Sequence, residues 1–509
     1  MTPEQQARQK IDAMLAAAGW LVQDAAAANI QAAPGVAIRE FPLPGHGFAD
    51  YLLYVDGRAA GVIEAKKAGA TLSGVEVQSD KYTQGLPETL PAWRRPLPFS
   101  YQLTGTETRF TNGLDPEPRA RPVFAFHQPE LLNEWLDDAC LKQDAIGEGP
   151  PPTYGPGGET FLSRLRNMPE LVRQGLWPAQ ITAITNLEKS LRENRPRALI
   201  QMATGSGKTF TSISFIYRLI KFAGARRVLF LVDRGNLGDQ TLKEFQQYVS
   251  PYNNFKFSEE YIVQRLSSNM LDTTARVCIC TIQRMYSMLR GNPLPPEDEE
   301  TSVQGLESLF KEQPPIEYNP SIPIETFDII VTDECHRSIY NLWAQVLEYF
   351  DAYLIGLTAT PNKQTFGFFN QNLVMEYSHE HAVADGVNVN YDVYRIKTQI
   401  TEGGSKVEAG YYVEQQDRET REKRWQELDE DLEYQAKQLD RDVVTPDQIR
   451  TVVRTFRDRL FQVGRELRSE VARAANTQLR VGLASPRGRR RLSRVHSGKA
   501  RCNPVRHAR

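Results

Sequence analysis

The chain lacks several features that would assign it to specialised classes of protein. No stretch reaches the ~18 consecutive apolar residues of a membrane-spanning helix, and the opening TPEQQARQK has no apolar segment of the secretion-signal type. There are only five cysteines, an odd number without paired CxxC motifs, which argues against a disulfide framework and a zinc ribbon. We therefore expect a protein of the reducing cytoplasm.

The chain also has almost no net charge. The 61 basic and 63 acidic residues leave −2, so a nucleic-acid site would have to be a local patch. The 509 residues, 40% of them hydrophobic, are enough for about three or four domains of roughly 100 to 200 residues each. Cys278 and Cys280 stand in an apolar run and are expected to be buried strand residues rather than metal ligands.

The first two segments differ sharply in pattern. Residues 1–145 predict an α+β domain, with an amphipathic helix over 5–18, strands at 51–55 and 59–65, and then mostly polar loops and short helices. Residues 146–160, which include GEGPPPTYGPGG, are too rich in proline and glycine for regular structure and predict a linker.

Three further segments follow the linker. In 161–385, apolar runs such as RRVLFLVDR and FDIIVTDE alternate with helical patterns, which predicts a parallel sheet with crossover helices. Residues 386–470 carry dense mixed charge and predict a connecting helical region with the start of another lobe. Residues 471–509 hold eleven Lys or Arg and no acidic residue. They are either a basic nucleic-acid arm or a disordered tail from a shifted reading frame.

The motif MATGSGKT, residues 202–209, follows the apolar strand ALIQ and precedes a helical pattern, as a phosphate-binding loop requires. Backbone N–H groups can hold the β-phosphate, the lysine can reach the β- and γ-phosphates, and the threonine can bind Mg²⁺. Met202 stands where the general pattern has glycine. The predicted ATP-binding residues are Thr204, Gly205, Ser206, Gly207, Lys208 and Thr209.

The sequence Asp333-Glu334-Cys335-His336 ends a second apolar strand. A carboxylate at the tip of a neighbouring parallel strand can bind the Mg²⁺ that accompanies the nucleotide, and we assign this role to Asp333. Glu334 is the candidate catalytic residue that orients the attacking water. Together with the loop, this motif predicts ATP and Mg²⁺ as cofactors.

Further motifs extend the resemblance to superfamily 2 helicases and translocases. LVDRGNLGDQ, TIQ, the DECH box and LTATP occur in the order typical of that superfamily, and Thr358-Ala359-Thr360 resembles its coupling motif. Gln180 resembles the glutamine that reads adenine. The resemblance also implies that Asp233, Arg234, Gln240, Thr281 and Gln283 lie on the nucleic-acid track.

The N-terminal domain contains a candidate nuclease site. Asp50 opens one predicted strand and Glu64-Ala65-Lys66 closes the next, with Asp56-Gly57 between them. Two carboxylates and a lysine can bind Mg²⁺ and activate water, the chemistry of PD-(D/E)xK nucleases. A strict two-residue turn would put Asp50 and Glu64 on opposite faces, whereas a three-residue loop or one bulge would pair them. We predict the longer turn.

Gln78 and Tyr82 form a QxxxY element behind the ExK strand. This element resembles the nuclease of type I restriction enzyme motor subunits, in which the pair supports cleavage, and the resemblance covers residues 1 to about 460. It implies a multidomain α/β protein: a PD-(D/E)xK-like α+β nuclease domain, a RecA-like parallel-sheet ATP-binding lobe and a charged helical region. It also implies double-stranded DNA as substrate, with methyltransferase (modification) and specificity subunits as partners.

A second motor lobe is not evident in the 148 residues after Pro361. The segment beginning at Gln462 is one residue short of the arginine-finger motif Q-x-x-G-R-x-x-R, so we interpret it as a chance match. The resemblance therefore predicts a C-terminally truncated chain. The alternatives are an ATP- and DNA-binding remnant without translocase activity, a non-enzymatic subunit, or another superfamily 2 helicase.

Overall fold

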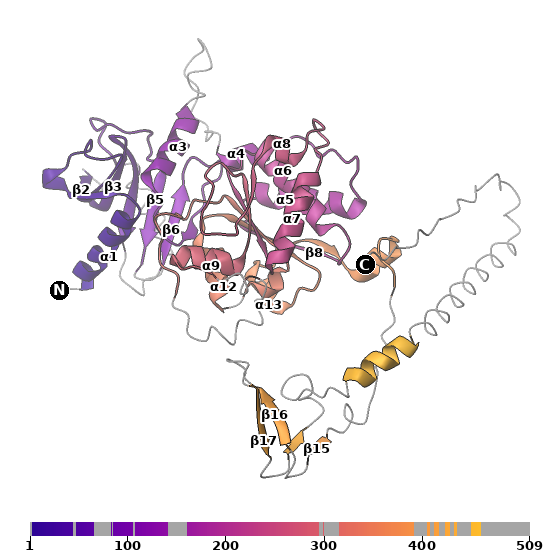
Figure 1. Ribbon diagram of the computed structural model, residues 1–509. Coiled ribbons are helices and arrows are strands. Elements are labelled where there is room, and N and C mark those ends of the chain that lie inside the picture. The colour runs from indigo at the N-terminus through magenta and orange to yellow at the C-terminus, as the bar shows by residue number, and fades with distance from the viewer. Residues whose placement is uncertain are drawn as a thin grey trace, which may run out of the picture. The chain divides into compact units, whose positions relative to one another are not determined.

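The computed structural model describes most of the first 390 residues and short segments beyond them. The described ranges are 3–43, 47–65, 83, 85–104, 107–140, 160–294, 299, 315–339, 341–390, 405–407, 412–416, 423–427, 432–434 and 449–459. The chain divides into two compact units, Met1–Asn390 and Tyr391–Arg509. Figure 1 shows the elements of each unit. No helix in the described ranges is both long and apolar enough to cross a bilayer.

The first unit begins with a seven-stranded mixed sheet whose spatial order follows the chain. Its strands, within the described residues, are β1 (Leu21–Asp24), β2 (Gly35–Leu43), β3 (Gly47–Val55), β4 (Arg58–Ala65), β5 (Phe99–Leu103), β6 (Thr108–Asn112) and β7 (Arg121–Val123). The pairs β1–β2 and β4–β5 are parallel and the others antiparallel. The single-turn η1 (Ala25–Ala27) follows β1.

Two helices contribute to the core on one face of this sheet. Leu15 of α1 (Pro3–Ala17) and Leu132 of α3 (Pro129–Cys140) belong to the same buried cluster as Tyr51, Ile63 and Tyr101. The predicted N-terminal helix and the first two predicted strands are confirmed. The prediction of loops and short helices after them is wrong for β5 to β7. Their buried polar residues, such as Gln102 and Asn112, hid the strand pattern.

A second seven-stranded sheet follows, and every described strand pair in it is parallel, as the sequence predicts. Its order is β10-β11-β9-β12-β13-β8-β14. The strands are β8 (Arg197–Met202), β9 (Val228–Val232), β10 (Val263–Arg265), β11 (Val277–Thr281), β12 (Ile329–Thr332), β13 (Tyr353–Thr358) and β14 (Leu373–Tyr377). Cys278 and Cys280 are buried in β11, as expected.

Helices cover both faces of this second sheet (Figure 1). One face packs against α4 (Phe161–Arg166), α5 (Pro178–Arg192), α6 (Lys208–Lys221), α7 (Gly235–Gln247), α8 (Phe257–Glu260) and α14 (His379–Ala384). The other packs against α9 (Ile282–Arg290), α12 (Asn341–Tyr349) and α13 (Lys363–Phe368). Ile330 faces one core and its neighbours Ile329 and Val331 face the other, because strand side chains alternate.

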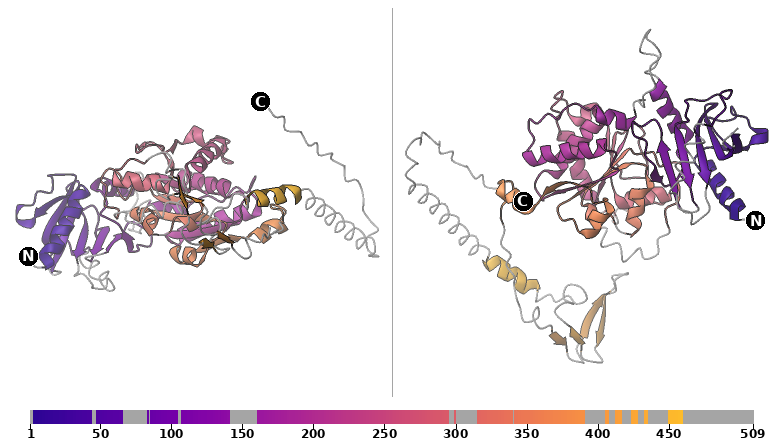
Figure 2. Two further views of the ribbon diagram at one scale, coloured as in Figure 1. Left: turned by 60° about the horizontal axis from the view of Figure 1, so that its bottom comes forward. Right: turned by 180° about the vertical axis from the view of Figure 1, so that it is seen from behind.

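The two sheets share a hydrophobic core. One cluster of buried side chains runs from the first sheet to the α9/α12 face of the second. The rings of Phe124 and Tyr349 meet within it, with centroids 4.8 Å apart. The right view of Figure 2, from behind, shows the purple strands of the first sheet beside the second sheet. The sheets therefore form one body, although most of the predicted linker lies outside the described residues.

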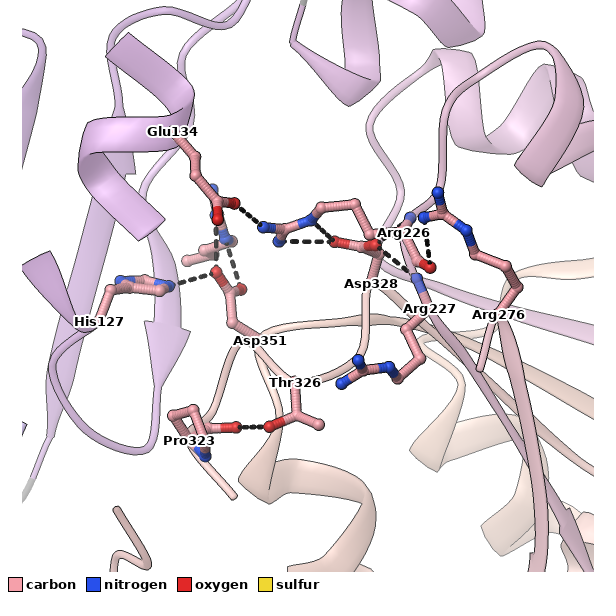
Figure 3. A network of polar contacts seen from close by, with 10 residues as sticks. His127, Glu134, Arg226, Arg227, Arg276, Pro323, Thr326, Asp328 and Asp351 are labelled. Atoms are coloured by element: carbon pink, nitrogen blue, oxygen red, sulfur yellow. Dashed lines mark hydrogen bonds and ion pairs between the residues drawn. The ribbon is translucent and has the colours of Figure 1, made fainter. Parts of the chain in front are cut away.

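Polar contacts supplement this shared core (Figure 3). The Arg121 guanidinium donates from Nε and Nη2 to the two oxygens of Asp351, both at 2.7 Å. His127 Nε2 lies 2.8 Å from Asp351 Oδ2, and Tyr101 Oη lies 2.7 Å from His127 Nδ1. Nearby, Arg226 contacts both Glu134 of α3 and Asp328 before β12. A carboxylate of the second sheet is thus held by side chains of the first.

The second unit is described only in part. Strand β15 (Ser405–Val407) pairs antiparallel with β18 (Leu432–Tyr434), and β16 (Tyr412–Gln416) pairs antiparallel with β17 (Lys423–Glu427). The helical prediction for 386–470 is therefore wrong at these strands and correct at 449–459. Tyr, Val and Trp favour strands, and mixed charge alone does not distinguish an exposed strand from an exposed helix.

Candidate functional sites: a nucleotide loop and a carboxylate pair

The predicted phosphate loop lies between β8 and α6. Gly205 and Gly207 both adopt a φ of +79°, a conformation that favours glycine, and Gly207 is the N-cap of α6. Lys208 begins the helix, and its Nζ donates to Met202 O at 3.3 Å, so the side chain folds back across the loop. The loop directs a helix N-terminus and a lysine toward one space, the arrangement that binds phosphate.

Gln180 packs directly against this loop. Its side chain is only 4% exposed, and Nε2 lies 3.5 Å from Gly207 O. Oε1 accepts the backbone N–H of Trp177 at 2.9 Å, which fixes the amide at the start of α5. A Cβ at position 207 would lie 2.5 Å from Gln180 Nε2, so a side chain there would displace the Gln180 amide. Adenine recognition by Gln180 stays a prediction.

Asp333 and Glu334 follow β12 at the carboxyl edge of the same sheet. Burial, together with the neighbouring Glu334 carboxylate, raises the pKa of Asp333 to about 6. Glu334 adopts a left-handed backbone conformation, with φ of 46°, which is uncommon for a residue other than glycine and typical of functional sites. We expected β12 to be the immediate neighbour of β8, but β13 lies between these two strands.

The intervening strand β13 ends at Thr358, whose hydroxyl contacts the DECH box. His336 Nδ1 and Thr358 Oγ1 are hydrogen-bonded at 2.9 Å, and the same oxygen accepts the N–H of Thr360 at 3.1 Å. Arg337 Nη1 also donates to Oδ2 of Asp233, the residue that follows β9, at 2.8 Å. These contacts join the predicted catalytic, coupling and nucleic-acid motifs. They depend on side-chain conformation, which the motif order could not reveal.

The other predicted nucleic-acid residues differ in accessibility. Arg234 and Gln240 are exposed at the start and in the first half of α7. Thr281 is fully buried and caps α9 through the backbone N–H of Arg284, and Gln283 is 2% exposed. Arg234 and Gln240 are thus accessible to solvent, whereas the Thr281 side chain is used in the helix cap, and the assignment of these residues to a nucleic-acid track stays a prediction.

The N-terminal hairpin brings Asp50 and Glu64 to one face of the first sheet. The longer turn that we predicted is wrong: Val55 pairs with Arg58 across the two-residue turn Asp56-Gly57, both at positive φ. The alternative of a bulge is correct. The pairing steps from Tyr54–Ala59 to Leu53–Gly61, which leaves Ala60 as the additional residue.

The bulge restores the register that the carboxylates require. Tyr51 pairs with Ile63, so the preceding Asp50 comes opposite Glu64. The N–H of Ala65 donates to Asp50 Oδ2 at 2.7 Å, which ties the two strand ends together. Glu64 is 5% exposed. The other predicted nuclease residues, Lys66, Gln78 and Tyr82, lie outside the described residues.

The donor sets of both sites suit Mg²⁺. Carboxylate oxygens are the ligands that this ion prefers, and Asp50 with Glu64 supplies two of them on one face, while Thr209 and Asp333 supply a hydroxyl and a carboxylate. Within the described residues no three His, Cys, Asp or Glu side chains gather as a metal cluster. Mg²⁺ commonly retains waters and binds substrate phosphate, so two protein ligands are sufficient.

Sequence comparisons identify related proteins. The family model "Type III restriction enzyme, res subunit" matches residues 174–363. The endonuclease subunit of the type I restriction enzyme EcoKI from Escherichia coli K12 is 26% identical, over 81% of this chain and 37% of that protein. The corresponding EcoAI subunit of Escherichia coli is 29% identical, over 55% of this chain and 30% of that protein.

Among solved structures, a fragment described as an HsdR subunit of a type I restriction enzyme from Vibrio vulnificus YJ016 is 24% identical. The match covers 67% of this chain and 51% of the Vibrio vulnificus fragment, with a TM-score of 0.28. The chain spans about a third of the length of the two curated relatives. By these matches, the protein is a relative of the endonuclease subunits of type I restriction enzymes.

Proposed function

We propose that this chain is a motor-nuclease subunit of a type I restriction-modification system in the cytoplasm. In this proposal it hydrolyses ATP to move double-stranded DNA and cleaves both strands in a Mg²⁺-dependent reaction, assembled with methyltransferase and specificity subunits. One observation carries the proposal: a single body contains both a phosphate loop and two carboxylates paired on one sheet face.

The ATP site would use loop residues 204–209. Their backbone N–H groups and Lys208 would hold the phosphates, and Thr209 and Asp333 would hold Mg²⁺. The ion would neutralise charge on the phosphates. Glu334 would orient the attacking water, and its carboxylate lies 3.4 Å from His336 Nδ1.

The nuclease site would use Asp50 and Glu64 as oxygen ligands, with Lys66, Gln78 and Tyr82 as further catalytic residues. Mg²⁺ would supply charge stabilisation for the phosphodiester and a more acidic water. Asp50 is held against the end of β4 by the Ala65 N–H group, so the pair is fixed before DNA binds.

DNA-stimulated ATP hydrolysis tests the motor part of the proposal. The purified chain should hydrolyse ATP with Mg²⁺, and linear duplex DNA should increase the rate. Lys208→Ala should remove the activity, whereas Lys189→Ala, on the neighbouring helix α5, should retain it. ATP binding without any DNA stimulation would instead favour the alternative, an ATP- and DNA-binding remnant without translocase activity.

A superfamily 2 helicase outside restriction is the other alternative. It would hydrolyse ATP on DNA but would have no nuclease dependent on Glu64. Mg²⁺-dependent nicking of plasmid DNA by the chain, lost in Glu64→Ala, distinguishes the two. Nicking that persists in the variant would contradict the nuclease assignment.

A further inference from the structure

The carboxylate pair belongs to a longer row of polar side chains. Glu64 in β4 pairs with Gln102 in the parallel strand β5, and Gln102 pairs with Arg109 in β6. Paired residues on neighbouring strands point to the same face. Asp50, Glu64, Gln102 and Arg109 therefore form one line across four strands, which we call the polar row.

The neighbouring line of side chains on this face is different in character. It consists of Leu52, Val62, Ser100 and Thr111, none of which is ionisable. The polar row lies one step nearer the carboxyl ends of β4 and β5. Ligands of sheets with parallel strands commonly bind at such ends. Charged and amide groups are thus concentrated where a substrate would bind.

Gln102 is the buried centre of the row. Its side chain is 2% exposed and lies between the strand of Glu64 and the strand of Arg109. A glutamine amide can donate to a carboxylate with its NH₂ group and accept from a guanidinium with its oxygen. Its placement suits it to orient Glu64 without adding a negative charge.

Arg109 forms the β6 end of the row. Its side chain is 38% exposed, and its Nε donates to Glu107 at 2.8 Å. A guanidinium carries five N–H donors, and the Glu107 contact uses Nε, on one edge of the group. With strand spacings of about 4.8 Å, Asp50 and Arg109 are separated by about 14 Å, the axial length of about four phosphate-to-phosphate steps on one DNA strand.

We propose that the polar row is the DNA-backbone track of the nuclease domain: Gln102 is a positioning residue for Glu64, and Arg109 binds a phosphate near the cleaved bond. This inference rests on the proposed nuclease function and assigns it two additional residues. Neither belongs to the ExK or QxxxY patterns, and only the strand register brings them beside the carboxylates.

Metal binding tests the role of Gln102 without a cleavage assay. Mn²⁺ binding to the nucleotide-free full chain is measured by electron paramagnetic resonance, and Glu64→Ala identifies the signal from this site. Gln102→Ala should weaken binding by about 10- to 100-fold, the usual effect of losing a residue that orients a metal ligand. Ser100→Ala, on the same face two residues away and 8% exposed, is the matched control.

A second variant keeps this test valid if Gln102→Ala folds poorly. Gln102→Met retains the approximate size of the side chain but removes the amide. Weaker Mn²⁺ binding is expected if the amide positions Glu64, whereas a purely structural role, in which the side chain only fills space, predicts no change in affinity. Wild-type affinity in both folded variants would overturn the proposal.

Salt dependence tests Arg109. Removing one phosphate contact should reduce the slope of log affinity against log salt by about 1. Duplex binding by Arg109→Ala is compared with Arg8→Ala, which removes another exposed arginine that pairs with a glutamate, at 2.6 Å. The slope should fall only for Arg109→Ala, and equal slopes for the two variants would overturn the proposal.

The experiments distinguish a failure of the proposed nuclease function from a failure of the polar-row proposal. If Glu64→Ala leaves Mn²⁺ binding and plasmid nicking unchanged, the nuclease assignment itself is wrong. If Glu64→Ala abolishes both while the Gln102 and Arg109 variants match their controls, only the extended row is wrong.

Discussion

Asp351 is the residue on which the polar junction between the two sheets depends. Its carboxylate, 10% exposed, is held by Arg121 on both oxygens and by His127. Burial opposes the charged form, but the Arg121 and His127 contacts outweigh it and hold the pKa of Asp351 well below its ordinary value. The junction therefore stabilises an ionised carboxylate in a nearly dry position.

Asp351→Asn should be strongly destabilising because it leaves Arg121 without its compensating charge. Breaking a fully buried ion pair by removing one partner costs about 3 to 5 kcal/mol. Because the Arg121 side chain is 30% exposed, we expect a loss of about 3 kcal/mol in the free energy of unfolding in urea. Glu348→Gln removes the exposed pair with Arg197, in which Glu348 is 50% exposed, and should cost about 0 to 1 kcal/mol. Equal losses in the two variants would contradict the role assigned to Asp351.

The same carboxylate predicts a dependence of stability on pH. Since folding lowers the pKa of Asp351, its contribution is complete above the ordinary aspartate pKa of about 3.9 and is lost as pH falls toward the folded value. Between about pH 5 and about pH 3, the parent chain should therefore lose more unfolding free energy than Asp351→Asn. Parallel losses would show that Asp351 does not contribute.

Gly207 combines two requirements of the nucleotide loop. Its φ of +79° opposes a side chain, and a Cβ there would lie 2.5 Å from Gln180 Nε2 and displace that amide. Gly207→Ala should lower the free energy of unfolding by about 1 to 3 kcal/mol and weaken ATP binding. Gly367→Ala, in α13 with open space around its Cβ position, should be neutral or stabilising. Calorimetry with and without ATP measures both effects.

At the scale of elements, the tips of β12 and β13 are linked through His336 and Thr358. If this bond transmits the nucleotide state, Thr358→Val should retain ATP binding but lose most of the stimulation of ATP hydrolysis by DNA. Thr358→Ser keeps the hydroxyl and should retain the stimulation. Full DNA stimulation in Thr358→Val would exclude this bond as the coupling contact.

The β3–β4 hairpin shows how far sequence predicts an element. Asp56-Gly57 indicated the turn, and alternating apolar residues indicated both strands. The bulge at Ala60 could not be located, because alanine is small and apolar and fits either face of a strand. The sequence required some irregularity to pair Asp50 with Glu64, but only the register shows where it lies.

At the scale of the whole molecule, the parallel sheet and its nucleotide loop were predictable because each strand is an apolar run that ends in a recognisable motif. The shared core was not. Phe124 and Tyr349 lie far apart in the sequence, and no local pattern indicates that their rings meet. The row from Glu64 to Arg109 was hidden for the same reason, since the pairing of Glu64 with Gln102 joins β4 and β5, which are separated by a long connection.

The most direct test measures ATP hydrolysis and DNA cleavage together in the parent chain, Glu64→Ala and Lys208→Ala, with Mg²⁺, ATP and plasmid DNA. The central claim is that one body carries two distinct sites, a phosphate loop and a carboxylate pair. We expect Glu64→Ala to hydrolyse ATP at the parent rate without cutting DNA, and Lys208→Ala to lose ATP hydrolysis. Cleavage by Glu64→Ala, or ATP hydrolysis by Lys208→Ala, would contradict that claim.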